Sequence, residues 1–377
     1  MEKRAIGPDI LRGLAILLVA AYHMNSDSLP DAFATYVQPF GWMGVDIFFV
    51  LSGYLIGTEL LKPVQAGETP DLKVFYLKRS LRILPVFWTV LAVYLAFPVL
   101  HEGPTMAPAW RFLTFTLNFG LDIRTMRTFS NAWSLCVEEH FYLIMPLLIL
   151  GLQRLRRPGV PAALFVLVIG GGMILRHSLW LAWQARGGHT VDFMKMLYYP
   201  SYTRFDGLAL GVAMAALRLF HREGWDRFAR PGLTLPIGLL CIGVAVYMVK
   251  RDGFILTEPG SIVLYPTFAL GAAFVLAAVL ELESRLQWAR WTGLGFIAAI
   301  SYSFYLSQKM VYHAADLWLP HAWMHGWAAV AIYYGSAIAV ATGLYLAIER
   351  PILTLRKILL NRLRNATNNG VADRKRN

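Results

Sequence analysis

Two polar residues interrupt the first apolar stretch of the chain, residues 10–24. Arg12 lies near the start of this stretch, and His23 lies near its end, eleven residues later. At about 100° per residue, this spacing brings both side chains to one helix face, about 16 Å apart along the axis. That face would carry a fixed cation and an imidazole, a side chain suited to proton transfer. Two simpler explanations stay open, namely an arginine that extends to the membrane surface and an interfacial histidine.

A carboxylate is expected at the same depth as His23. Asp46 follows Trp42 by four residues in the second apolar stretch, 41–61. A carboxylate in an apolar setting needs a partner. We predict that the partner is His23, whose tautomer and basicity Asp46 would then set. The alternative is a structural aspartate that caps the span.

A basic cluster precedes the third apolar stretch. Arg79 and Arg82 are three residues apart and share a helix face, with Lys73 and Lys78 nearby. Guanidinium groups match phosphate oxygens, so the cluster could hold a phosphorylated donor. The alternative is an ordinary membrane anchor that binds lipid headgroups.

More ionisable residues stand at the outer ends of later stretches. Glu138 and Glu139 are adjacent, and Tyr142 follows Glu138 by one helical turn. Arg204 and Asp206 open the sixth stretch, where an ion pair from Arg204 to one of the two glutamates is an alternative to a substrate contact. We predict that the two glutamates are catalytic and that Tyr142, Arg204 and Asp206 bind substrate.

The composition predicts an all-α polytopic membrane protein. The chain has 377 residues, of which 57% are hydrophobic and 15% charged, whereas soluble domains have about 25% charged residues. Its net charge of +12 comes from loops between apolar blocks, so we expect no nucleic-acid partner. Cys136 and Cys241 supply neither a disulfide framework nor a metal site, and we expect no metal and no permanently bound cofactor.

About ten membrane spans are expected, and short loops separate them. They are 6–25, 41–61, 81–100, 132–151, 160–181, 203–219, 233–250, 261–281, 292–316 and 326–348. The apolar piece 109–119 is too short to span. With the N-terminus inside, cytoplasmic segments hold 24 Lys and Arg residues, and outer loops hold 7. This bias predicts cytoplasmic termini, with Arg12 at the inner end and His23 at the outer end.

Sorted by predicted depth, the polar residues form two groups. His23, Asp46 and the glutamate pair belong to the outer half, and Arg12 and the pair of arginines after residue 78 belong to the inner half. This arrangement predicts a polar path through the bundle, with a base near its outer mouth and anion-binding cations at its inner mouth.

At these residues the chain resembles the acyltransferase-3 family of integral membrane O-acyltransferases. The resemblance covers residues 5 to about 352, and rests on DILRGLAILLVAAYHM, GVDIFFVLSGYLI, KRSLRILP and WSLCVEEHFYL, with weaker support from RFDGLALG, ISYSFYLS and ERP. Many members have histidine where this chain has Gln308. We therefore expect residues 1–352 to form the family's transmembrane domain, and 353–377 to form a basic cytoplasmic tail with a disordered end.

The resemblance implies transfer of an acyl group, most often acetyl from acetyl-CoA, to a hydroxyl of a carbohydrate or glycoconjugate. Arg12 and His23 match the family's signature pair, Arg79 and Arg82 match its donor-side pair, and Glu138 lies in its acidic motif. The expected setting is the cell inner membrane, with acyl-CoA as co-substrate and either no helper or a separate partner protein. The competing hypothesis is a transporter that moves a solute or acyl group past buried Arg, His and Glu residues.

Overall fold

The structure, a computed structural model, describes residues 5–155, 157, 159–252 and 257–361. Every regular element among these residues is helical, and the one β-type contact is an isolated bridge between Met106 and Thr128. The all-α prediction is confirmed for this part of the chain. The predicted disorder at the end of the tail falls outside the described residues.

Each of the ten predicted spans coincides with a long helix. The helices are α1 (Ile6–Tyr22), α3 (Met43–Gln65), α4 (Leu72–Ala96), α6 (Trp133–Leu155), α7 (Gly159–Ala185), α9 (Asp206–Phe220), α11 (Pro231–Asp252), α12 (Glu258–Glu281), α13 (Leu294–Trp318) and α14 (Gly326–Leu344). A π-helical turn, Tyr345–Glu349, continues α14 into a helical segment over 350–361. Shorter helices include α2 (Asp31–Tyr36), α5 (Ala109–Leu113), α8 (Thr190–Phe193) and α10 (Arg222–Phe228).

Seven of the helical segments in the described residues are long and apolar enough to cross a membrane. The chain is therefore a multi-pass membrane protein. Three of the ten predicted spans are outside this group: α1 and α9 have 17 and 15 residues, and α13 buries a polar series that includes Ser301, Gln308 and Lys309. The count of ten spans stays a prediction.

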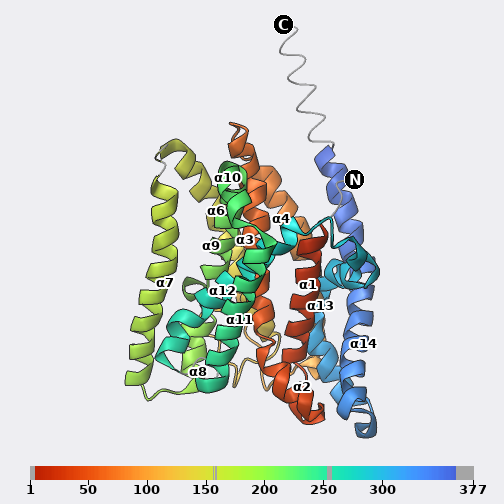
Figure 1. Cartoon of the computed structure of the whole chain (residues 1–377). Coiled ribbons are helices and arrows are strands. Elements are labelled where there is room, and N and C mark those ends of the chain that lie inside the picture. Colours follow the sequence, from red (N-terminus) through yellow and green to blue (C-terminus); the bar gives the residue numbers. More distant parts are fainter. Residues whose placement is uncertain (1–4, 156, 158, 253–256, 362–377) are drawn as a thin grey trace.

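Helices α1, α3 and α13 form the centre of the bundle, and α7 and α14 lie at its edges (Figure 1). The closest packing joins α3 to α9, and it depends on glycine. A Cβ atom on Gly53 would lie 2.1 Å from the Leu208 carbonyl oxygen, and one on Gly211 would lie 2.3 Å from the Val50 carbonyl oxygen. Small residues let membrane helices approach this closely, so α3 and α9 are held in a fixed register.

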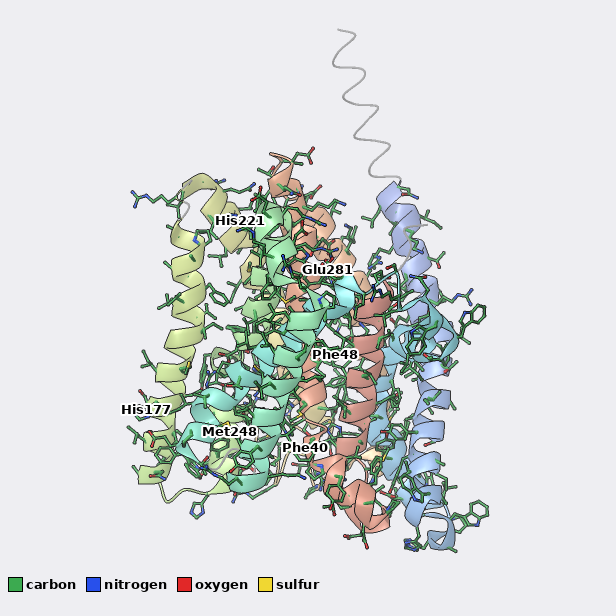
Figure 2. The ribbon with its side chains drawn as sticks, viewed as in Figure 1. Phe40, Phe48, His177, His221, Met248 and Glu281 are labelled. Atoms are coloured by element: carbon green, nitrogen blue, oxygen red, sulfur yellow. The ribbon has the colours of Figure 1, made fainter. Side chains whose placement is uncertain are left out.

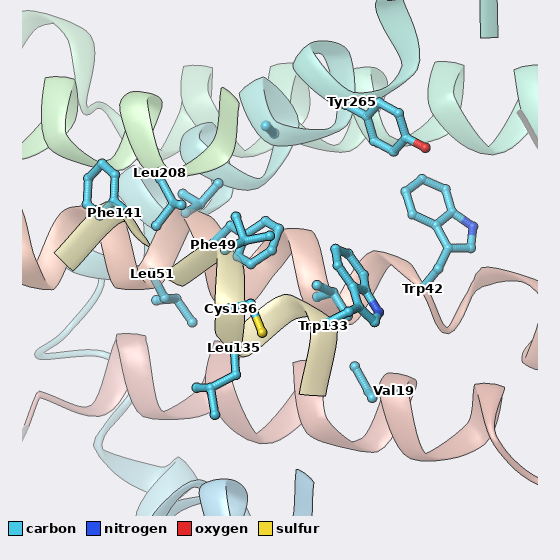
Figure 3. Packing of buried hydrophobic residues seen from close by; sticks show 14 of the residues in the cluster. Val19, Trp42, Phe49, Leu51, Trp133, Leu135, Cys136, Phe141, Leu208 and Tyr265 are labelled. Atoms are coloured by element: carbon cyan, nitrogen blue, oxygen red, sulfur yellow. The ribbon is translucent and has the colours of Figure 1, made fainter. Parts of the chain in front are cut away.

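Aromatic side chains fill the space between the central helices. Phe49 of α3 meets Trp133 of α6 edge-on, with ring centroids 6.3 Å apart, and Tyr265 of α12 meets Trp42 edge-on at 6.5 Å (Figure 3). By contrast, α7 exposes Val166, Leu167 and Ile174 at 67, 65 and 70%. In lipid such apolar exposure carries no penalty, so this face of α7 can lie against the bilayer.

The two ends of the bundle are distinct. Glu281 and His221 lie towards one end, Phe40 and His177 lie towards the other, and Phe48 lies between (Figure 2). The first described residues of α1 and the 350–361 helix share the end near Glu281 (Figure 1). We call this the inner end and the opposite one the outer end. Since the described ends of the chain lie on the same side, the arrangement agrees with the predicted topology.

Candidate active site

A narrow, partly open cavity lies among α1, α3, α4, α6 and α13. Its volume is about 100 Å³. Its apolar wall includes Phe48, at mid-height in the bundle (Figure 2). Its polar lining consists of Arg12, Ser52, Arg79, Arg82, Ser134, Glu138, Tyr142, Ser301, Tyr302 and Tyr305. The cavity therefore joins three cations to a carboxylate and a series of hydroxyl groups.

Arg12 and Arg79, at the inner end of the cavity, are held by neighbours on α1, α3 and α6. Glu59 accepts hydrogen bonds from Arg79 and from Lys78, the latter at 2.9 Å. The Arg79 guanidinium also lies 5.6 Å from the centroid of the Tyr142 ring. Nη1 of Arg12 lies 3.2 Å from Oδ1 of Asp9, one turn earlier. The three predicted donor-side residues thus line one cavity, as the donor hypothesis requires.

Glu138 lines the same cavity as the arginines, although the sequence analysis assigned them to different halves of the bundle. The hydroxyl of Tyr142 donates to Glu138 Oε2 at 2.6 Å and lies 3.2 Å from Ser52 Oγ. Glu138 is five residues into α6, about 7 Å below its outer end. Glu139 does not line the cavity, and its Oε1 is buried without a hydrogen-bond partner among the described residues.

His23 stands just past the last turn of α1, on the outer side of the cavity. Its Nδ1 lies 2.9 Å from the Val19 carbonyl oxygen. A carbonyl oxygen can only accept, so Nδ1 carries the proton, and Nε2 has the free lone pair of a base. The side-chain amide of Gln308 lies against the ring, with its Nε2 3.4 Å from Nδ1. The position at which this chain departs from the family pattern therefore touches His23.

Asp46 does not pair with His23, contrary to our prediction. Both of its oxygens lie 3.0 Å from Nη2 of Arg204. Beside this pair, Arg176 binds Asp206 at 2.7 and 3.2 Å. The predicted ion pair from Arg204 to a glutamate is also wrong, because α9 packs along α3 and brings Arg204 to Asp46 instead of to α6.

The two ion pairs are fully enclosed. The side chains of Arg176 and Arg204 are 0% exposed, and the Arg204 guanidinium lies 3.9 Å from the centroid of the Tyr265 ring. Neither Arg204 nor Asp206 lines the cavity. Two of the predicted substrate-side residues are thus part of a buried array that ties α3, α7, α9 and α12 together.

Polar side chains of α13 that the sequence analysis did not assign to the site lie at the cavity and at His23. The Tyr305 hydroxyl donates to the Asn131 carbonyl at 2.7 Å and lies 2.6 Å from Ser134 Oγ. Asn131 in turn donates to the Tyr305 carbonyl at 2.8 Å. Ser301, Tyr305 and Gln308 are spaced by four and three residues, so they share one face of α13. That spacing is a signal the sequence carries.

The segment between α4 and α6 contacts α13 at the outer end of the bundle, beside His23. Lys309, next to Gln308, donates to the Arg127 carbonyl at 2.9 Å and to Ser130 Oγ at 3.0 Å. Its Nζ also lies 4.0 Å from Oε2 of Glu102. The same Oε2 accepts from the Phe129 backbone at 3.1 Å. The loop between α4 and α6 is therefore held against α13 by charged contacts.

A family model described as an acyltransferase domain matches residues 6–346. The chain belongs to the acyltransferase-3 family. The peptidoglycan O-acetyltransferase OatA of Listeria monocytogenes is 30% identical over 228 residues, 57% of this chain and 34% of that protein. YrhL of Bacillus subtilis is 27% identical over 325 residues, 80% of this chain and 47% of YrhL.

The O-acetyltransferase OatA of Staphylococcus aureus is a further relative, 26% identical over 267 residues, 66% of this chain and 40% of that protein. This acyltransferase-3 chain thus spans about a third to a half of the length of the curated relatives it matches. No solved structure matches the chain.

Proposed function

We propose that the protein is an O-acetyltransferase of the cell inner membrane, with ten spans and cytoplasmic termini, which transfers acetyl from acetyl-CoA to a carbohydrate hydroxyl. The observation that carries the proposal is the polar column through the bundle. It begins at Arg12, Arg79 and Arg82, continues past Glu138 to Ser134 and Tyr305, and ends at His23. Cations and base lie at opposite ends of this column.

The inner end suits a phosphorylated donor. Guanidinium groups bind phosphate oxygens through paired N–H donors. The cavity beyond them is narrow and lined by both apolar and hydroxyl side chains, so it suits a thin chain that ends in a thioester. The acceptor is proposed to approach from the outer end, where His23 lies.

His23 is proposed to act as the base. Its Nε2 takes the proton of the acceptor hydroxyl as the acceptor oxygen bonds to the acetyl carbonyl carbon. The carbon–sulfur bond then breaks, and the thiolate leaves with a proton as free CoA. In the alternative order His23 first carries the acetyl group and then passes it to the acceptor. Both orders require a neutral Nε2, which the bond from Nδ1 to Val19 provides.

Peptidoglycan is the first acceptor to test, because the Listeria relative is named a peptidoglycan O-acetyltransferase and the Bacillus relative a putative one. The chain would be expressed in a bacterium whose own envelope O-acetyltransferases are deleted. Mass spectrometry of peptidoglycan and of other envelope glycans would then detect O-acetyl esters. Esters that appear only with the protein support transfer, and a transporter would change solute uptake without adding an ester.

The His23→Ala variant tests the assignment of the base. A general base contributes about 10²–10⁴ in rate, so this variant should lose at least about 99% of ester formation while its amount in the membrane stays normal. His321→Ala is the matched control, because His321 is an exposed histidine just past the outer end of α13. Ester formation by His23→Ala at the level of His321→Ala would remove His23 from the mechanism.

A further inference from the structure

A fourth guanidinium joins the inner end of the column from a distant part of the sequence. Arg356 belongs to the 350–361 helix, which the sequence analysis assigned to a basic tail. Its Nη1 donates to the Lys78 carbonyl of α4 at 3.3 Å. The charge of Arg356 is repelled by those of Arg79 and Arg82 and attracted by that of Glu59. The helix that follows α14 is therefore anchored beside the cluster that opens the cavity.

Lys78, Arg79, Arg82 and Arg356 bring four positive charges to this cluster, against the carboxylates of Glu59 and Glu138. Glu59 is the carboxylate that Lys78 and Arg79 share, and Arg356 brings a further positive charge to the same place. The Nε atoms of Arg79 and Arg356 are both buried without a hydrogen-bond partner among the described residues. Like charges repel, and buried donors without acceptors are unfavourable. Both costs are relieved when an anion with several oxygens binds.

We propose that Arg356 is part of a phosphate-binding site at the inner end, shared with Arg79 and Arg82, and that the 350–361 helix supplies it. The ligand chemistry is a phosphate ester. Its identity as the nucleotide of the acyl-CoA donor rests on the proposed function. The arginine fork fits this chemistry, because its N–H groups bind two phosphate oxygens at once. The donor would then contact both the arginines that line the cavity and the 350–361 helix.

Binding to purified protein in nanodiscs of neutral phosphatidylcholine tests the site directly. The probes are CoA and adenosine 3′,5′-bisphosphate, measured by calorimetry. Loss of a hydrogen bond to a charged group typically weakens binding by about tenfold or more, so Arg356→Ala should raise the Kd for both probes by about this factor. Lys357→Ala is the matched control, because it removes the same charge from the neighbouring, exposed position, and it should change the Kd by less than twofold.

Steady-state kinetics give a second, independent measurement. S-Acetylpantetheine carries the thioester without the nucleotide. Arg356→Ala should therefore raise the KM for acetyl-CoA about tenfold and leave the KM for S-acetylpantetheine unchanged. Arg356→Lys keeps the charge without the fork, and should recover only part of the affinity for CoA. Equal effects on both donors would overturn the proposal, because they would indicate a general distortion of the protein.

The outcomes separate this site from its alternatives. Wild-type affinity for both probes in Arg356→Ala would overturn the site. If Arg356→Ala instead weakens only binding to vesicles that contain phosphatidylglycerol, the cluster binds lipid headgroups and the proposal is overturned. If the bisphosphate binds through Arg356 but no acetyl ester forms on any glycan, the phosphate site stands and the proposed function fails. Failure of the wild-type protein to bind either probe would overturn the site as well.

Discussion

Two groups of arginines lie in this membrane protein, and their surroundings differ. In the buried array, Arg204 and Arg176 each meet one carboxylate, Asp46 and Asp206, and their side chains are fully enclosed. At the inner end of the column, Lys78 and Arg79 share Glu59 while Arg356 adds to the same cluster. In the buried array each arginine has its own carboxylate, which indicates a structural role. At the inner end several basic side chains lie together, which indicates a site for an anionic ligand.

The largest effect in this comparison is expected from breaking the balanced array. Asp46→Ala leaves the Arg204 guanidinium enclosed without its carboxylate. Removal of one partner from a buried pair costs about 3–5 kcal/mol, so the variant should unfold at a clearly lower temperature or fail to accumulate. Thermal unfolding in detergent and the amount of protein in the membrane measure this effect.

Two further variants show whether the effect comes from an unbalanced charge. The double variant Asp46→Leu with Arg204→Met removes both charges and should regain most of the lost stability. Asp226→Ala breaks an exposed pair with Arg222, at 54 and 66% exposure, and should cost no more than about 1 kcal/mol. A stable Asp46→Ala variant that lacks activity would instead return Asp46 to the catalytic group.

The basic cluster at the inner end of the column should respond differently, with a loss of donor binding and not of stability. Arg79→Ala leaves Glu59 paired with Lys78, so folding should be preserved. Donor binding should weaken by about 10- to 100-fold, since hydrogen bonds to charged groups contribute about 1.5–3 kcal/mol. The expected result is a higher KM for acetyl-CoA with little change in kcat and in the apparent affinity for the acceptor.

Arg285→Ala is the control for Arg79→Ala, because Arg285 is an exposed arginine beyond the inner end of α12. Raising the salt concentration should weaken donor use by the wild-type protein more than by Arg79→Ala, because the variant has already lost one charged contact. An unchanged KM for acetyl-CoA in Arg79→Ala would contradict donor docking at the inner end.

Patterns along single helices were enough to predict part of this picture. Hydropathy located every long helix, and the spacing of Arg12 and His23 placed them at opposite ends of the column. Partners on different helices could not be predicted in this way. Asp46 meets Arg204 because glycines bring α9 against α3, and no spacing within one helix encodes that contact.

Contacts between groups at different backbone depths could not be predicted either. Glu138 was assigned to the outer half and Arg79 and Arg82 to the inner half, yet all three line one cavity. An arginine extends several ångströms beyond its own turn, so groups at different backbone depths meet. Tyr305 and Gln308 could have been found from their shared face on α13, but a four-and-three spacing also describes ordinary helix packing.

The smallest effect is expected at Gln308, which neither group of arginines contacts. Its amide lies against the His23 ring, whose Nδ1 already donates to Val19. Gln308→Ala therefore removes a lateral support and leaves the tautomer of His23 unchanged. Both nitrogens of this contact are donors, so it contributes packing and not a hydrogen bond; kcat should therefore fall by a few-fold at most, and the KM for acetyl-CoA should stay constant. Gln287→Ala, an exposed glutamine near the inner end, should change neither value. A loss as large as that of His23→Ala would mean that Gln308 contacts the reacting atoms directly, and that the active end of the column extends onto α13.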